Sequence, residues 1–272
     1  MPKFLSPEQI ERFRKDGYVA PLRVMSTERA AALRKTLEDF EKSNGPLMKV
    51  ARFRPHLLLS SIRDLIRDVR ILDAVEDLFG PNILVWSSDF LIKDAGDPAF
   101  VSWHQDSNYW GLSSPDVVTA WVAISESNEA NGAMKVVPGT HNEEVLPHRD
   151  TFAKNNILLR GQEISVDVNP SRAVTLELQP GEMSLHHVGI VHGSEPNRSQ
   201  TQRRMGFAIR YIPTYVRQLD RKASATLVRG VDEVRSFDHE PVPTRDMDPV
   251  CVSFREMANQ KAAAANLVAG KK

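Results

Sequence analysis

The residues best suited to chemistry in this sequence are a histidine and an aspartate two positions apart, in His104-Gln105-Asp106. In a β-strand, side chains at positions i and i+2 project from the same face, so His104 and Asp106 would converge on one point. A third ligand must come from a distant segment, and the candidate is His192 in VHGSEPN. Two imidazoles and one carboxylate on one face of an octahedral ion leave positions open, as in non-haem Fe(II) oxygenases.

Other histidines leave alternatives to this metal site. His148-Arg149-Asp150 repeats the pattern, but it follows Pro147 in a charged stretch, so we interpret it as solvated surface. His186 and His187 compete with His192 as the third ligand, and His186 shares strand parity with His192. A His-x-Asp pair also arises by chance in ordinary strands.

A pair of arginines follows His192 in the sequence. An enzyme that uses 2-oxoglutarate must hold the far carboxylate of that acid, and a planar guanidinium does so with two donors. Arg203 and Arg204 directly precede the apolar run MGFAIRYI, and either could reach the interior. Strand parity alone does not choose between them, and both could instead face water in NRSQTQRR.

The elements that must position these residues begin with a mainly helical part, residues 1–80. Ser6-Pro7-Glu8-Gln9 has the form of a capping box, which predicts a helix after Ser6. Apolar residues at helical spacing predict a second helix after Ser26 and a third over about 70–78. Residues 250–269 predict a terminal helix.

A strand-rich part follows over residues 82–213. Seven short apolar or alternating runs predict an antiparallel sandwich or barrel. Asn131-Gly132 predicts a hairpin between VVTAWVAIS and AMKVV, because Asn-Gly suits a turn with positive φ. Residues 141–165 carry many charges and little strand pattern, which is typical of a lid or a loosely ordered insertion. The sequence contains no internal repeat and no separable linker, so we predict one domain over residues 1–272, mostly β with flanking helices.

Composition excludes several classes of protein. Lys and Arg total 35 against 35 for Asp and Glu, a net charge of zero, which argues against an electrostatic nucleic-acid binder. We expect no membrane span, because no apolar run reaches the required length, and no secretory signal, because the first residues turn polar too soon. A lone cysteine, Cys251, fits a reducing compartment, and we expect a cytoplasmic protein. Oligomeric state is unknown at this point.

Taken together, these segments resemble the phytanoyl-CoA dioxygenase family of Fe(II)- and 2-oxoglutarate-dependent oxygenases. The similarity covers about residues 86–211, in the family's order, through SWHQD, TAWVAIS, NGAMKVVPGTH, GEMSLHH and VHGSEPNRSQTQRR. It implies a double-stranded β-helix, a jelly-roll (cupin-like) barrel, with iron near its open end. It also implies that 2-oxoglutarate and O2 are cosubstrates and that His104, Asp106 and His192 bind Fe(II).

The resemblance extends to the 2-oxoglutarate site. Arg203, eleven residues after His192, matches the arginine that pairs with the far carboxylate, which selects Arg203 over Arg204. Trp121 and Ser194 match positions that contact the cosubstrate; the alternatives are a core Trp and a turn Ser. No catalytic residue beyond the metal ligands is implied. Related halogenases have a small residue at the position of Asp106, so a carboxylate there favours hydroxylation.

The substrate site rests on strand parity. If the His104 strand continues, Asn108 and Trp110 share its inward face and Tyr109 lies at the rim. Trp110 and Tyr109 could box an ammonium group by cation–π attraction, or simply form an apolar wall. An anionic group could meet one of four basic residues that could equally face water: Lys49, Arg52, His56 and Lys93.

A narrower resemblance, carried by KVARFRPHLLLSSIRDLI, ILDAVEDLFGPNI, SWHQDSNYWGL and GFAIRYIPTYVRQ, is to bacterial dioxygenases of organophosphonate catabolism. These hydroxylate 2-aminoethylphosphonate or its trimethylammonium analogue at the carbon next to phosphorus. The alternatives are a hydroxylase of another small amine-bearing metabolite or of an acyl thioester, and a non-enzymatic jelly-roll module whose histidines are incidental.

Overall fold

A computed structural model describes residues 2–269, except for the side chains of residues 108, 109 and 263–269. The helices are α1 (Pro7–Asp16), α2 (Thr27–Asn44), α3 (Leu47–Val50), α4 (Ser60–Leu65), α5 (Val69–Phe79) and α6 (Pro249–Ala269). The predicted capping box starts α1, because the Ser6 hydroxyl accepts from the Gln9 N–H at 3.2 Å while the Gln9 side chain accepts from the Ser6 N–H at 2.8 Å. The helices predicted after Ser26, near 70–78 and at 250–269 are present as α2, α5 and α6.

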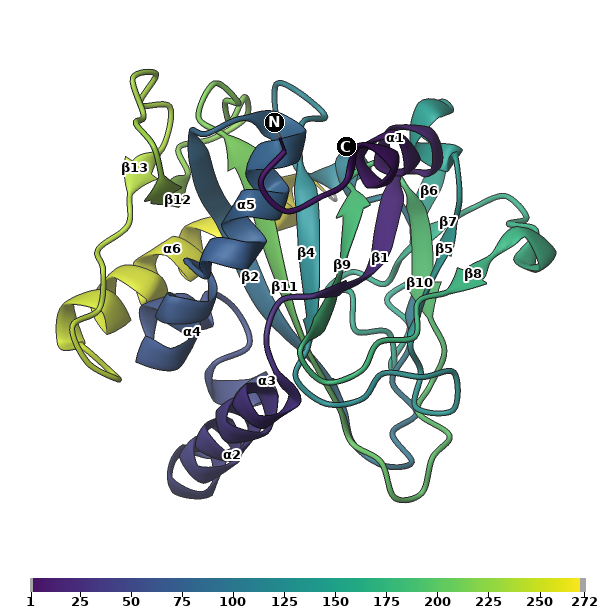
Figure 1. Ribbon diagram of the computed structural model, residues 1–272, viewed down its shortest axis with the longest axis horizontal. Helices are drawn as coiled ribbons and strands as arrows, with labels where there is room; N and C mark the ends of the chain where they lie inside the picture. Colours follow the sequence, from purple (N-terminus) through teal and green to yellow (C-terminus); the bar gives the residue numbers. More distant parts are fainter. Residues whose placement is uncertain (1, 270–272) are drawn as a thin grey trace.

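The strands form a jelly roll of two main sheets (Figure 1). The larger sheet has the order β1-β9-β4-β11-β2-β12-β13, the smaller has the order β3-β10-β5-β8, and β6 pairs with β7. The strands are β1 (Tyr18–Arg23), β2 (Ile83–Lys93), β3 (Val101–His104), β4 (Val118–Ala123), β5 (Met134–Val137), β6 (His148–Asp150), β7 (Gln162–Ile164), β8 (Val174–Thr175), β9 (Glu182–His187), β10 (Val191–Ser194), β11 (Arg204–Pro213), β12 (Ser224–Arg229) and β13 (Asp238–His239).

Two features differ from the sequence prediction. β1 lies within the part predicted to be mainly helical, and it extends the larger sheet by pairing with β9. Asn131-Gly132 does not join a hairpin, because β4 belongs to the larger sheet and β5 to the smaller. The turn uses the positive φ of Gly132, and the Asn128 and Asn131 side chains each accept a backbone N–H of the other. It therefore carries the chain from one sheet to the other.

The main core lies between the larger sheet and helices of the first eighty residues, which cover its outer face (Figure 1). On β11, Met205, Phe207, Ile209 and Tyr211 are fully buried in this core. Burying one such side chain stabilises the fold by about 1.5–3 kcal/mol. Because side chains alternate along a strand, the intervening positions of β11, from Arg204 to Arg210, face the opposite side, toward the smaller sheet.

None of the helices in the described residues has the length and apolar character that a membrane crossing requires.

Candidate metal centre and cosubstrate cavity

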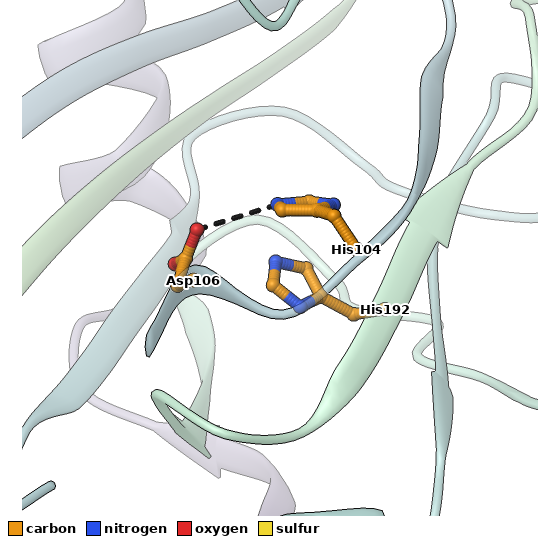
Figure 2. A group of neighbouring side chains, drawn as sticks. All are labelled: His104, Asp106 and His192. Atoms are coloured by element: carbon orange, nitrogen blue, oxygen red, sulfur yellow. Dashed lines mark ion pairs between the residues drawn. The ribbon is translucent and has the colours of Figure 1, made fainter. Parts of the chain in front are cut away.

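Three predicted ligands meet between the two sheets. Candidate ligand atoms of His104, Asp106 and His192 all lie within 4.8 Å of one another, and all three residues are buried. Figure 2 shows the carboxylate and both imidazoles turned toward a shared space, with His104 Nε2 3.3 Å from Asp106 Oδ1. This is the donor set of a facial Fe(II) site, in which one carboxylate and two neutral nitrogens leave the remaining positions open.

Neighbouring strands of the smaller sheet bring the ligands together. His192 on β10 is the direct pairing partner of His104 on β3, and their rings lie 4.1 Å apart. The strand ends at His104, but Gln105 keeps an extended backbone (φ −120°, ψ 124°), and Asp106 begins the short 3₁₀ helix Asp106–Tyr109. The predicted convergence of His104 and Asp106 is therefore retained, whereas the strand does not continue through residue 110, the condition on which the placement of Asn108 and Trp110 rested.

Backbone carbonyls orient both histidines. Nδ1 of His104 donates to the Ser102 carbonyl at 2.9 Å, and Nδ1 of His192 donates to the Ile190 carbonyl at 3.0 Å. In neutral imidazoles this leaves the lone pair on each Nε2, directed at the shared space. A second hydrogen bond that fixes the tautomer is typical of metal-binding histidines. The donor set and its outer contacts thus fit Fe(II).

Electrostatics favour the protonation states that bind a metal. Burial opposes ionisation of Asp106, but its neighbours His104, His192 and Arg210 outweigh burial and hold the pKa of Asp106 below the usual range. Burial, reinforced by His104, lowers the pKa of His192 to about 4. At neutral pH the site therefore offers an anionic oxygen and a neutral imidazole.

A cavity opens beside these ligands, walled by both sheets and by part of the 141–165 segment. Trp121 and Ser194, the residues predicted to contact 2-oxoglutarate, line this cavity. His186 lines it too, with its ring 5.2 Å from that of His192, although it lies on β9 of the larger sheet and not on the strand of His192. Among the described residues, the group with metal-binding geometry contains His192 and not His186.

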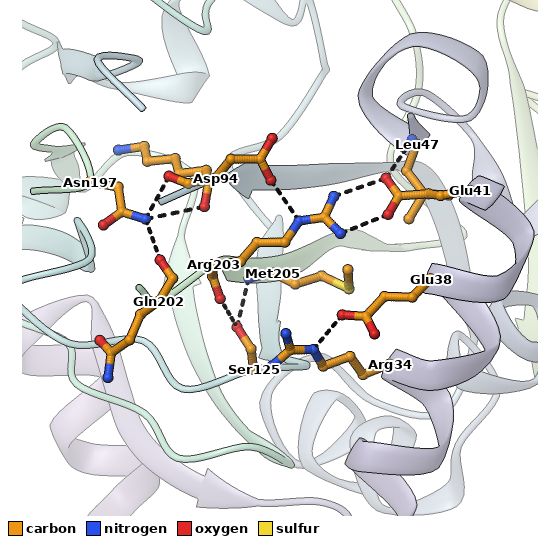
Figure 3. A network of polar contacts seen from close by, with 11 residues as sticks. Arg34, Glu38, Glu41, Leu47, Asp94, Ser125, Asn197, Gln202, Arg203 and Met205 are labelled. Atoms are coloured by element: carbon orange, nitrogen blue, oxygen red, sulfur yellow. Dashed lines mark hydrogen bonds and ion pairs between the residues drawn. The ribbon is translucent and has the colours of Figure 1, made fainter. Parts of the chain in front are cut away.

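The prediction that Arg203 faces the cavity is wrong. Its guanidinium makes a two-pronged ion pair with Glu41 on α2, at 2.7 and 2.9 Å, and its Nε lies 2.8 Å from Asp94 (Figure 3). Because strand neighbours point to opposite faces, Arg204 lines the cavity instead. The signal in the sequence was the alternation in MGFAIRYI, whose large apolar residues lie on the side of Arg203.

Arg204 has the surroundings of a carboxylate-binding residue. It is 2% exposed, its guanidinium carbon lies 5.4 Å from the Trp121 ring centroid, and one Nη donates to the Gly132 carbonyl. Its Nε is buried without a hydrogen-bond partner among the described residues. Burying such a donor costs free energy unless a ligand accepts a hydrogen bond from it. Burial lowers the pKa of Arg204 to about 10, so it stays cationic at neutral pH.

Lys93 does not line the cavity but contacts Ser194, which does. Its Nζ donates to the Ser194 hydroxyl at 2.7 Å and to the Glu195 carbonyl at 2.5 Å. Burial, together with the charge of Arg204, lowers the pKa of Lys93 to about 6. Lys93 therefore orients Ser194.

The other basic candidates lie in different surroundings. Lys49 is exposed, and His56 is buried in a network around Glu240. Of the four basic residues considered for an anionic group, only Arg52 lines the cavity.

The predicted aromatic box is only partly described. The side chains of Asn108 and Tyr109 lie outside the described part of the chain. Trp110 is half-buried and stacks on Trp86, with ring centroids 4.8 Å apart. The guanidinium of Arg210 lies 5.8 Å from the Trp110 ring, so a protein cation already occupies that side of the aromatic group.

The 141–165 segment contributes residues that sequence reasoning missed. Ile157 and Leu158 line the cavity, and backbone hydrogen bonds of Phe100 with Asn155 and Ile157 attach this stretch to the start of β3. His148, interpreted from the sequence as solvated surface, is half-buried on β6 and accepts a hydrogen bond from the backbone of Gln105. For His148 that interpretation was wrong, because the residues after Pro147 form a strand rather than a solvated loop, whereas Arg149 is exposed as expected.

Comparison with known proteins agrees with this geometry. The phytanoyl-CoA dioxygenase (PhyH) family profile matches residues 1–205. A probable alpha-ketoglutarate-dependent hypophosphite dioxygenase from Stutzerimonas stutzeri is 34% identical over 171 residues, which cover 61% of this chain and 59% of that enzyme. An ectoine dioxygenase from Bordetella parapertussis is 25% identical over 233 residues, 75% of each chain.

Solved structures show the same architecture. The non-heme monooxygenase ThoJ, in its apo form, has a TM-score of 0.82 and 32% identity, with 95% of this chain and 97% of ThoJ covered. CytC3 with Fe(II) and alpha-ketoglutarate has a TM-score of 0.65 and 25% identity, with 90% and 96% covered. The chain therefore belongs to the phytanoyl-CoA dioxygenase family of Fe(II)- and 2-oxoglutarate-dependent dioxygenases.

Proposed function

We propose that this protein hydroxylates an aliphatic C–H bond of a small molecule, with 2-oxoglutarate and O2 as cosubstrates and succinate and CO2 as coproducts. The observation that carries the proposal is one cavity containing the His104–Asp106–His192 group and the buried, incompletely hydrogen-bonded Arg204. When bound, Fe(II) supplies the activation of O2 and of 2-oxoglutarate. His104, Asp106 and His192 would hold the ion.

Protein side chains account for the remaining requirements. Arg204, with Ser194 and Trp121, would orient 2-oxoglutarate through its far carboxylate. Leu91, Met134 and Leu158 give the cavity apolar walls, which limit the access of water. The buried carbonyl partners of His104 and His192 keep both ligands in one orientation.

For the substrate, we propose 2-aminoethylphosphonate or an N-methylated analogue, hydroxylated at the carbon next to phosphorus in organophosphonate catabolism. Two observations support a phosphorus oxyanion. The relative from Stutzerimonas stutzeri is named for hypophosphite, and Arg52 and Arg210 line the cavity in addition to Arg204. A cytoplasmic location remains part of this proposal.

Another small amine-bearing metabolite is the second candidate, favoured by the similarity to ectoine dioxygenase.

Succinate release tests both the reaction and the substrate. The enzyme is incubated with Fe(II), O2 and 2-oxoglutarate and with aminophosphonates, other amines, amino acids or acyl thioesters in parallel. We expect an aminophosphonate to stimulate release and to gain one oxygen atom by mass. Stimulation by another class would reject the phosphonate proposal and keep the reaction. No 2-oxoglutarate turnover with any compound, together with no binding of Fe(II), would reject the hydroxylase proposal and favour a binding module.

A further inference from the structure

We propose that Arg52 and Arg210 form a clamp for the anionic head of the substrate, at the end of the cavity away from Arg204. The inference rests on the proposed hydroxylase function and identifies the chemical class of its substrate, a small molecule with one net negative charge on an oxyanion head. Phosphonates, sulfonates and carboxylates belong to this class.

Strand geometry separates the clamp from Arg204. Arg204 and Arg210 lie on the same face of β11, six residues apart, which corresponds to about 20 Å along a strand. The metal ligands His192 and Asp106 line the same cavity as both arginines. A cosubstrate held at Arg204 and a substrate held at Arg210 could therefore approach the same ion from two directions.

Asp89 holds the clamp in place. Arg210 Nη1 donates to Asp89 Oδ2 at 2.6 Å, from the neighbouring strand β2. The backbone of Arg52 is fixed on the same strand, because its carbonyl accepts the Phe90 N–H at 3.0 Å, and its Nη2 donates to the Ile157 carbonyl at 2.7 Å. Both guanidiniums are thus positioned before any ligand arrives, which reduces the entropic cost of binding.

Unused donors point to a missing acceptor. The Nε atoms of Arg52 and Arg210 are buried without a hydrogen-bond partner among the described residues, and so is the hydroxyl of Thr119, the β4 partner of Arg210. All three residues line the cavity. Buried donors are normally satisfied, and an oxyanion with several lone pairs can accept from more than one of them.

The charge of the cavity is complementary to a monoanion. Its lining carries three arginines, Arg52, Arg204 and Arg210, and two carboxylates, Asp89 and Asp106, which leaves one positive charge. Fe(II) and doubly charged 2-oxoglutarate cancel each other. A substrate with a net charge of −1 would make the closed site neutral, whereas a cation would leave uncompensated buried charge.

Binding to the loaded protein tests the clamp without turnover. Ni(II) replaces Fe(II), 2-oxoglutarate is added to saturation, and calorimetry at pH 8 measures binding of three compounds of net charge about −1, namely 2-aminoethylphosphonate, ethanesulfonate and propionate, and of ethanolamine. We expect binding by at least one of the three compounds with an acidic head, and none by ethanolamine, which has the amine alone. Arg52→Met should weaken that binding about tenfold or more, and Arg210→Lys should weaken it through loss of the planar donor pair.

Controls separate the clamp from the proposed function. Arg34→Met removes a partly exposed arginine on α2 that pairs with Glu38, and it should leave all affinities unchanged. The affinity for 2-oxoglutarate should stay within about threefold in the Arg52 variant. The clamp is refuted if no acidic compound binds the loaded wild-type protein. It is also refuted if Arg52→Met binds the acidic compound as tightly as the wild-type protein does, or if Arg52→Met loses affinity for 2-oxoglutarate and not for the acidic compound. Failure of the wild-type protein to bind 2-oxoglutarate at all would refute the hydroxylase proposal itself.

Discussion

His148 accepts a hydrogen bond at 3.0 Å from the backbone N–H of Gln105, the residue that separates His104 from Asp106. Nδ1 of His148 donates to the Leu146 carbonyl at 2.6 Å, so its Nε2 carries the accepting lone pair. The Gln105 side chain accepts from the Leu146 N–H and donates to the Gly189 carbonyl, both at 2.8 Å. Residues 146–148 therefore fix the backbone between two metal ligands.

Removing this support should loosen the metal site. We predict that His148→Ala lowers Fe(II) affinity by about tenfold or more, because contacts outside the ligands orient them. His239→Ala is the matched control, since His239 on β13 pairs with Asp232 and lies outside the cavity lining. Anaerobic Fe(II) titration of both variants measures the effect. Equal affinity in the two variants would show that His148 has no positioning role.

The neighbouring arginines should have opposite phenotypes. Arg204→Met should raise the Kd for 2-oxoglutarate by about tenfold or more, because a charge-assisted pair inside the cavity is lost. Arg203→Met should leave that Kd unchanged and reduce the free energy of unfolding by about 1 kcal/mol, through loss of the partly buried pair with Glu41. Calorimetry and urea unfolding distinguish the two. If Arg203→Met weakened 2-oxoglutarate binding and Arg204→Met did not, Arg203 would be the residue that binds the cosubstrate.

Gly206 leaves room for Trp121. A Cβ at this position would lie 1.9 Å from Trp121 Cζ2, so Gly206→Ala must displace the indole that lies beside Arg204. Overpacking of this kind reduces stability by about 1–3 kcal/mol. We expect a lower melting temperature and weaker 2-oxoglutarate binding together. Unchanged binding with reduced stability would mean that Trp121 only fills the core.

The buried carboxylate of Glu240 should make the free energy of unfolding depend on pH. Glu240 interacts with Arg54 and His56 and accepts hydrogen bonds from Ser224 and Thr226. Burial opposes ionisation of Glu240, but its interactions with Arg54 and His56 outweigh burial and lower its pKa from 4.5 to about 2. A depressed folded pKa stabilises the fold above pH 4.5, and the contribution of about 3 kcal/mol disappears as the pH falls toward 2.

Replacement of Glu240 by Gln tests this sign. We expect the free energy of unfolding of Glu240→Gln to lie well below the wild-type value at pH 7, and the difference to shrink between pH 5 and pH 3. Urea unfolding of both proteins across that range provides the measurement. A difference that stays constant with pH would show that ionisation of Glu240 is not its source.

Local patterns predicted much of this molecule correctly. Helix caps such as Ser6 are short-range signals, and the spacing of His104 and Asp106 places both residues at one point whether or not the strand continues. The alternation along β11 also separates Arg204 from Arg203 once the apolar positions are known to face the helices, which the sequence alone did not establish. Spacing taken from the family resemblance favoured Arg203, and the burial pattern of this chain overrides it.

Long-range contacts could not be read from the same patterns. Arg52, Asp89 and Arg210 come from separate segments, and their meeting depends on the pairing of β2 with β11. His148 reaches Gln105 because a charged segment folds back over β3, which composition alone does not predict. The Asn131-Gly132 turn was recognised as a turn, but the sheet that each flanking strand joins is a property of the whole fold.

Anaerobic Fe(II) titration of the wild-type protein and of His192→Ala tests whether His104, Asp106 and His192 bind iron. We predict one tightly bound ion per wild-type chain, and a loss of affinity of at least about a hundredfold in His192→Ala, with the circular dichroism spectrum unchanged. His186→Ala, which removes a neighbouring buried imidazole outside the ligand group, should retain the ion. Equal Fe(II) binding by the wild-type and His192→Ala proteins would contradict the proposed metal centre.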